Sequence, residues 1–363
     1  MNKKFDITGI YRERQKRVAS LFTDEIAAMW VTHLPNIRYL CGFSGSSGGL
    51  LLLREKAIFF TDFRYQEQSE KETGAAVERV IFKTTAGEAL LEYLKMHSIQ
   101  VLGIEGVLSV DAHEVIRRGF SGKITVLKGL PEKVRRVKDL YEIECLRKAF
   151  AIADRSYAKL LKFLKTGRRE IDIAAKLEYY MRTGGSDGPS FDTIIASGER
   201  SSCPHAHPTL RKTAVGEMLK IDFGAVYAGY HSDMTRTVFF GKPDAKFTEI
   251  YGIVSEAQRR AIAAIRPGVP CIDIDKIARD HIAAHGHGER FGHSLGHSLG
   301  LEIHELPAFS QKSSDTLEEG MVLTVEPGIY LPGWGGIRIE DVYVVRKDGP
   351  ERLTNTPNDL FAI

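Results

Sequence analysis

Short apolar runs separated by polar segments fill the first third of the chain. Six runs between residues 27 and 127 have the length and composition of β-strands, and residues 87–98 show the apolar spacing of a helix. The runs are AAMWVTH, GLLLL, AIFFTD, VERVIF, VLGIE and ITVL. This pattern predicts a small α/β domain over residues 15–128. The Gly/Ser-rich segment 42–49 lacks the GK[ST] ending of a P-loop, so we interpret it as a plain loop.

The composition changes near residue 130. The segment GLPEKVRRVKD at 129–139 begins with turn residues and continues with charge, and a long amphipathic pattern then runs from 140 to 165. A further helix is predicted over 170–183, ending at two glycines. We therefore expect two domains, residues 1–130 and residues 131–363.

The second domain alternates pairs of helices with groups of strands. A strand is predicted near 191–197 and a hairpin at 218–240, followed by helices near 246–265 and 271–285 and a second hairpin at 321–346. This order predicts an α+β fold. Its two halves have the same plan, which is compatible with an internal duplication.

Composition and charge narrow the functional classes. The chain has 363 residues, 43% of them hydrophobic and 27% charged, which is typical of folded globular proteins. The net charge of +3 and the lack of a dense basic run argue against nucleic-acid binding. No apolar stretch approaches the roughly 20 residues of a membrane span. The N-terminal stretch lacks the apolar core of a secretory signal, and four dispersed cysteines suit a reducing cytoplasm.

The first predicted hairpin carries two aspartates. In MLKIDFGAVYAGYHSDMTRTVFF, Asp222 and Asp233 lie almost symmetrically about a turn at residues 227–230. Cross-strand partners on one face are close together, so we expect the two carboxylates to repel each other unless a cation lies between them.

The second predicted hairpin repeats this arrangement with two glutamates. Glu326 and Glu340 lie symmetrically about Gly333 in MVLTVEPGIYLPGWGGIRIEDVYVV. Either acidic pair alone could be solvated on an exposed face. Both pairs, however, lie among strongly apolar strand residues, and four buried acids are very costly without cations.

Half of the twelve histidines fall between the two hairpins. We interpret His281, His285 and His287 as surface residues. The other three, His293, His297 and His304, lie in a glycine-rich stretch whose backbone can approach a site closely. Carboxylates with one imidazole suit divalent ions such as manganese, and two ions would be bridged by carboxylates. The sequence has no HExxH, which excludes the usual mononuclear zinc protease.

Taken together, these segments resemble the pita-bread metallopeptidases of family M24, which include methionine aminopeptidase, aminopeptidase P and prolidase. The similar blocks are IDFGAVYAGYHSDMTRT, GHSLGHSLGLEIHE, TVEPGIY and IRIEDVYVV, in the family's order over residues 135–363. NIRYLCGFSGSSG and TDFRY resemble the extra domain of the proline-specific branch. The resemblance implies a pita-bread α+β catalytic domain preceded by a smaller creatinase-like α/β domain.

The resemblance also implies a ligand set for two divalent metal ions. Asp222 would chelate one ion, Asp233 and Glu340 would bridge both, and His297 and Glu326 would complete the other shell. Manganese is the expected metal, with cobalt, zinc and iron as alternatives. One departure is visible, because Ser298 stands where the family usually has a glycine.

Four further residues receive roles from the resemblance. His205, rather than His207, would face the substrate, and His304 would hydrogen-bond the scissile carbonyl. His293 matches an active-site histidine of the proline-specific members. Arg338 would support the bridging glutamate.

The implied activity is hydrolysis of an Xaa-Pro bond at the N-terminus of a small peptide, through a hydroxide bridging the two metals, with Glu326 handling its proton. An aminopeptidase P is the expected type and an Xaa-Pro dipeptidase (prolidase) the alternative. A creatinase-like enzyme would lack the ligands, a non-catalytic binding module would show degraded ones, and methionine aminopeptidase lacks the extra domain. The resemblance further implies a homodimer.

Overall fold

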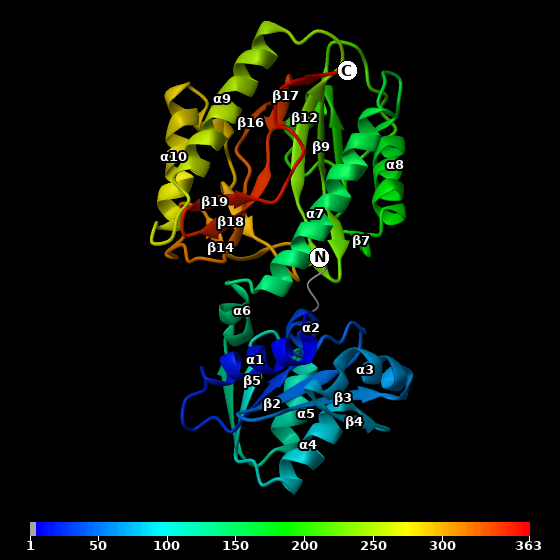
Figure 1. The fold of residues 1–363 in the computed structure, drawn as a ribbon, viewed down its shortest axis with the longest axis vertical. Helices are drawn as coiled ribbons and strands as arrows, with labels where there is room; N and C mark the ends of the chain where they lie inside the picture. Colours follow the sequence, from blue (N-terminus) through cyan, green and yellow to red (C-terminus); the bar gives the residue numbers. More distant parts are fainter. Residues whose placement is uncertain (1–4) are drawn as a thin grey trace. The chain divides into compact units, whose positions relative to one another are not determined.

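The computed structural model describes residues 5–363 and divides into two compact units, one ending at Arg135 and the other running from Arg136 to Ile363. Figure 1 shows the elements of both units. The first four residues, part of the stretch predicted to lack a secretory signal, lie outside the described range. None of the described helices is long and apolar enough to cross a membrane.

The first unit is built on a six-stranded mixed sheet in the order β4-β3-β2-β1-β5-β6. Its strands are β1 (Ala28–Val31), β2 (Gly49–Leu53), β3 (Ala57–Asp62), β4 (Glu78–Phe82), β5 (Val101–Glu105) and β6 (Lys123–Leu127). Its helices are α1 (Ile7–Ala19), α2 (Leu34–Cys41), α3 (Gln66–Thr73), α4 (Ala86–Met96), α5 (Val110–Gly119) and α6 (Leu130–Arg135). Every run predicted as a strand forms one, and the predicted helix is α4.

Local signals explain where these elements begin and pack. A capping box at Thr85 and Glu88 starts α4, satisfying backbone N–H groups at its first turn. Apolar residues of α4, such as Leu90, pack with Trp30 and Phe60 of the sheet in one buried core. The small α/β domain expected from the alternating pattern is therefore confirmed.

The second unit contains two pairs of helices and several short strands. The helices are α7 (Leu140–Leu161), α8 (Glu170–Thr183), α9 (Ala245–Ala263) and α10 (Cys271–Ala284). The strands of the first half are β7 (Gly188–Pro189), β8 (Ile194–Ser197), β9 (Met218–Phe223), β10 (Ala225–Tyr227), β11 (Tyr230–His231) and β12 (Met234–Phe239). Those that follow α10 are β13 (Gly296–Ser298), β14 (Glu305–Phe309), β15 (Val322–Val325), β16 (Gly328–Leu331), β17 (Gly335–Arg338), β18 (Asp341–Arg346), β19 (Gly349–Arg352) and β20 (Phe361–Ala362).

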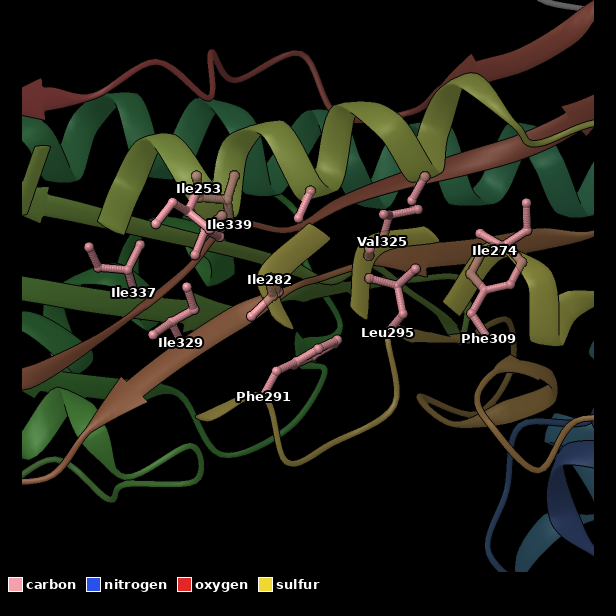
Figure 2. Close-up of a cluster of buried hydrophobic side chains, with 14 of the residues drawn as sticks. Ile253, Ile274, Ile282, Phe291, Leu295, Phe309, Val325, Ile329, Ile337 and Ile339 are labelled. Carbon is pink, nitrogen blue, oxygen red and sulfur yellow. The ribbon is translucent and has the colours of Figure 1, made fainter. Parts of the chain in front are cut away.

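Each helix pair covers its own group of strands. Helices α7 and α8 lie along β9 and β12, whereas α9 and α10 lie on the far side of the strands, beyond β16 and β17 (Figure 1). The core under α9 and α10 is formed by aliphatic and aromatic side chains, among them Ile253, Ile282, Phe309, Val325 and Ile337 (Figure 2). The second unit thus has two main hydrophobic cores, and Met218 of β9 and Phe239 of β12 pack in the one under α9 and α10.

Strand alternation decides which side chains enter these cores. Leu219, Ile221 and Phe223 of β9 pack in the first core, and Ile337 and Ile339 pack in the second. Successive strand residues point to opposite faces, so the even-numbered residues between them face away from the cores. The polar residues Lys220, Asp222 and Arg338 occupy such positions, and in β12 the core residues Met234 and Val238 leave Thr235 and Thr237 on the opposite face.

Candidate metal centre

The two aspartates of the first hairpin are diagonal neighbours and not direct partners. The turn at Ala228 and Gly229, both with positive φ, sets a register in which Asp222 faces Thr235. The predicted turn at residues 227–230 is confirmed, and the near symmetry of Asp222 and Asp233 about it is an offset of two residues. Diagonal neighbours still lie only about 7–8 Å apart on one face. Both aspartates are buried, at 6% and 5% exposed.

The two glutamates of the second hairpin face each other as predicted. Strands β15 and β18, and strands β16 and β17, pair in one continuous register. This register places Glu326 opposite Glu340, in agreement with their symmetry about Gly333. Glu340 is 1% exposed. The predicted burial of both acidic pairs is confirmed, with the Glu326 side chain still 15% exposed.

His297 points its Nε2 atom at the acidic residues. This atom lies 3.4 Å from Oε1 of Glu326 and 3.6 Å from Oδ2 of Asp233. The other ring nitrogen, Nδ1, lies 3.0 Å from the carbonyl oxygen of Ser298, to which it donates. In the neutral ring that bond leaves Nε2 unprotonated, with a free lone pair, as a metal-binding imidazole requires. One ligand atom each from Asp233, His297 and Glu340 lies within 4.8 Å of the other two.

The backbone around His297 explains why residue 296 is a glycine and why residue 298 can be a serine. A Cβ on Gly296 would lie 2.1 Å from the carbonyl oxygen of Thr324, so only glycine fits there. Ser298 lies in β13, where the pairing with β14 shifts register, and it is not among the described residues with positive φ. The serine that replaces the family's usual glycine is therefore accommodated without backbone strain.

Arg338 pairs with Asp222, and the other three carboxylates have no lysine or arginine ion-pair partner among the described residues. Burial, reinforced by neighbouring carboxylates, raises the pKa of Asp233 and of Glu340 well above their usual values. Burial likewise raises the pKa of Glu326 to about 7. Oδ1 of Asp222 and Oε1 of Glu340 are buried without a hydrogen-bond partner among the described residues. Unpaired buried oxygens beside an unprotonated imidazole nitrogen fit divalent cations in both charge and donor type.

A cavity of about 460 Å³ adjoins this cluster. Its lining includes all nine residues singled out from the sequence: His205, Asp222, Asp233, His293, His297, His304, Glu326, Arg338 and Glu340. His207 lines the same cavity. The structure thus brings together side chains that are separated by up to 135 positions in the chain.

His293 belongs to a hydrogen-bonded chain that includes a residue the sequence analysis missed. Its Nδ1 lies 2.8 Å from the carbonyl oxygen of Ser294, and its Nε2 lies 2.9 Å from the hydroxyl of Tyr330. Burial, reinforced by the charge of Arg338, lowers the pKa of His293 to about 3, so the ring is neutral. Nδ1 therefore donates, and Nε2 accepts from Tyr330, whose oxygen accepts from Arg338 at 2.9 Å. Arg338 also forms an ion pair with Asp222.

Two threonines that orient the glutamates were also missed. The Thr235 hydroxyl donates to Glu340 at 2.7 Å and accepts from Nε of Arg338 at 3.1 Å. The Thr324 hydroxyl donates to Glu326 at 3.0 Å and accepts from the backbone N–H of His297 at 3.0 Å. Each threonine lies two residues from an acid along the chain, so period-two alternation could have placed both on the face of the acids, although not in contact with a particular glutamate.

The surface position predicted for His281 is wrong. His281 is 7% exposed and lies in α10, four residues before the exposed His285. It follows buried Ile274 and Ala278 at helical spacing, which puts it on the buried face of the helix. Its ring contacts that of His285, with centroids 4.5 Å apart, and it does not line the cavity.

The fold and the cluster together define a two-domain protein whose larger unit presents a buried carboxylate–histidine site suited to divalent cations. Residues 144–347 match the model of metallopeptidase family M24, and residues 14–137 match that of the creatinase/prolidase N-terminal domain. The chain belongs to metallopeptidase family M24. The expected pita-bread catalytic domain with a creatinase-like domain before it is confirmed, and family membership implies an enzyme that uses divalent metal ions.

Similar proteins cover essentially the whole chain. An Xaa-Pro dipeptidase of Pyrococcus horikoshii is 38% identical over 97% of this chain and 99% of its own length. The solved structure of an Xaa-Pro dipeptidase from Bacillus anthracis is 39% identical, with a TM-score of 0.94 over 97% of this chain and 100% of that chain. The structure of an X-Pro aminopeptidase from Thermotoga maritima is 36% identical, with a TM-score of 0.91 over 96% of this chain and 100% of that chain.

Proposed function

We propose that the protein hydrolyses Xaa-Pro peptide bonds with two divalent metal ions, manganese being the first candidate. The observation that carries this proposal is the shared cavity, in which the predicted acids and histidines meet and two carboxylate oxygens lack partners. The named relatives, which act on Xaa-Pro substrates, support the specificity.

The proposed ligands come from both halves of the catalytic unit. Asp222 would hold one ion, His297 and Glu326 the other, and Asp233 and Glu340 both. When bound, such ions lower the pKa of a water molecule and polarise the scissile carbonyl. The mutual approach of Asp233, His297 and Glu340 to within 4.8 Å supports this assignment.

The remaining chemistry falls to side chains of the cavity. Glu326, with its pKa raised by burial, would accept the proton of the attacking water and return it to the proline nitrogen. An Xaa-Pro bond has no N–H, so recognition must use the carbonyl and the ring. His304 and His205 would donate hydrogen bonds to the carbonyl oxygen as it gains charge. His293, held by Tyr330, would help to shape the proline pocket.

Between the two proline-specific activities, the comparisons favour the dipeptidase. The sequence analysis preferred an aminopeptidase P and kept the dipeptidase as its alternative. The dipeptidase structure is the more similar of the two named structures, and the Pyrococcus horikoshii relative is also a dipeptidase. The Thermotoga maritima aminopeptidase keeps the other activity as a second candidate.

Cleavage of matched peptides tests the proposal. Metal-loaded protein is assayed with Ala-Pro, Ala-Pro-Ala and Ala-Ala, and with an Asp233→Ala variant as the control. We expect Ala-Pro to be cleaved fastest, Ala-Ala to be resistant, and the variant to be inactive when metal is limiting. Failure to cleave either proline peptide would overturn the proposal, and cleavage of the tripeptide alone would favour the aminopeptidase.

Three further proposals concern organisation and setting. The division after Arg135 and the N-terminal match to residues 14–137 support a domain boundary near residue 130. Cys41, Cys203 and Cys271 are free thiols, which supports a reducing, cytoplasmic setting. A homodimer remains an expectation from the family resemblance, and light scattering of the purified protein would test it.

A further inference from the structure

Lys220 is a fully buried lysine next to the proposed metal centre. It lies in β9, two residues before Asp222, and has no exposed surface. Its odd-numbered neighbours Leu219 and Ile221 enter the hydrophobic core, so Lys220 and Asp222 share the opposite, polar face. Lys220 forms no ion pair with any described carboxylate, which leaves the reason for a buried lysine open.

Its Nζ atom instead contacts three backbone carbonyls of one loop. The carbonyl oxygens of Ser201, Cys203 and Pro204 lie 3.1, 2.7 and 3.1 Å away, respectively. The ring of Tyr330 lies 5.2 Å from the same atom. An ammonium group can donate to all three carbonyls, whereas a neutral amine can donate to only two of them.

The loop that Lys220 holds leads directly into His205. Residues 203–210 contain no helix or strand, and His205 itself is exposed toward the cavity that it lines. The other side-chain contact to Pro204 is a 3.4 Å bond from Arg338. Lys220 therefore provides the short hydrogen bonds that join this loop to the strand that carries Asp222.

We propose that Lys220 is a positioning residue that sets the distance between His205 and the metal ligands by fixing the backbone of residues 201–204. This inference rests on the proposed peptidase function. A misplacement of about 1 Å in a catalytic group can reduce the rate roughly 100-fold, so the loop's attachment matters for turnover even though Lys220 contacts no substrate.

A double-mutant cycle separates positioning of His205 from a general effect. The variants are Lys220→Met, His205→Ala and both together, with His304→Ala in place of His205→Ala as the matched control cycle. We expect Lys220→Met to reduce kcat/KM for Ala-Pro by roughly 10–100-fold when His205 is present. In the His205→Ala background the further loss should be less than about twofold, whereas with His304→Ala the two losses should multiply. Multiplying losses in both cycles would overturn the inference.

A second measurement follows the loop itself and does not need activity. Cys203 is the exposed cysteine of the four, so a nitroxide label attaches there while the buried thiols are protected. Electron paramagnetic resonance should show greater label mobility in Lys220→Met than in the unsubstituted protein, at equal metal content. Unchanged mobility would overturn the inference. Should Lys220→Met fail to fold, Lys220→Gln, which keeps an amide donor, is carried through both measurements.

These outcomes distinguish the inference from the function on which it rests. If the unsubstituted protein cleaves neither proline peptide, the proposed function fails while the label still reports on the loop. If that protein is active and the cycle with His205 shows no coupling, only the role of Lys220 fails.

Discussion

A buried ion pair between Lys138 and Glu305 supports the segment that carries two of the proposed active-site histidines. The Lys138 Nζ atom lies 2.8 Å from Oε2 of Glu305, and their side chains are 0% and 7% exposed. Nζ also lies 3.5 Å from the hydroxyl of Ser298. Glu305 directly follows His304, and Ser298 directly follows His297, so one lysine contacts the neighbours of both histidines. We therefore predict that Lys138→Met affects both stability and turnover.

The expected loss of stability follows from the burial of the pair. Removing one partner of a buried ion pair typically costs about 3–5 kcal/mol, because the other charge remains in a poorly solvated position. For a unit of this size, each kcal/mol lowers the melting temperature by about 2–4 °C. Lys138→Met should thus lower the transition of the catalytic unit by roughly 6–20 °C. The double variant Lys138→Met/Glu305→Gln, which removes both charges, should recover part of that loss.

Calorimetry and urea unfolding of the metal-loaded proteins measure this effect, with the surface variant Lys276→Met as the control. Lys276 forms an exposed i,i+4 pair with Asp280, for which a change below about 1 kcal/mol is expected. A Lys138→Met protein as stable as the Lys276→Met protein would refute the reasoning. A double variant less stable than Lys138→Met would also refute it, since it would show that the unpaired charge is not the source of the cost.

Three further predictions concern the metal centre. Substituting a residue that only hydrogen-bonds to a metal ligand typically reduces metal affinity roughly 10–100-fold, and Asp233→Asn should reduce it by more. Metal titration of dialysed protein measures this, and an unchanged affinity would remove Asp233 from the ligand set. Tyr330→Phe leaves Nε2 of His293 without its donor, a loss of about 1–3 kcal/mol that should lower kcat/KM roughly 5–100-fold, and an unaffected kcat/KM would exclude a role for this bond. In metal-free protein the Glu326 pKa of about 7 exceeds its usual 4.5, so the folded state binds more protons than the unfolded state between these values. Stability should therefore fall by about 3 kcal/mol as pH rises from 4.5 to 7; urea unfolding would check this, and a rise would contradict it.

Much of the fold was predictable because its strands follow a simple alternation. The apolar runs of the first unit and the odd-numbered apolar residues around Asp222 and Glu326 are patterns within single segments. The symmetry of Glu326 and Glu340 also survived, since their hairpin pairs in one continuous register. The turn of the first hairpin also lies where it was predicted, but Asp222 and Asp233 are not equidistant from it, so the register makes them diagonal neighbours.

Other parts of the site depend on contacts that no segment reveals by itself. Thr235 reaches Glu340 across 105 positions, and Lys220 reaches a loop 16 to 19 residues upstream. Choosing His297 among six neighbouring histidines required the family resemblance. His281 was predicted at the surface, although its helical spacing to Ala278 puts it on the buried face of α10. Residues whose role depends on a distant partner are the ones for which local patterns carry no information.

The two main hydrophobic cores of the catalytic unit imply that metal binding would also stabilise the junction between its halves. Asp222 and Asp233 extend from strands packed in one core, whereas His297, Glu326 and Glu340 belong to strands packed in or beside the other. An ion held by both sets would act as a cross-link between the strands around these two cores. Removal of the metal with a chelator should then leave each core intact and loosen their junction, so amide exchange would rise first where β12 and β17 meet. The cation would in this way have a structural role between the two halves as well as a catalytic one.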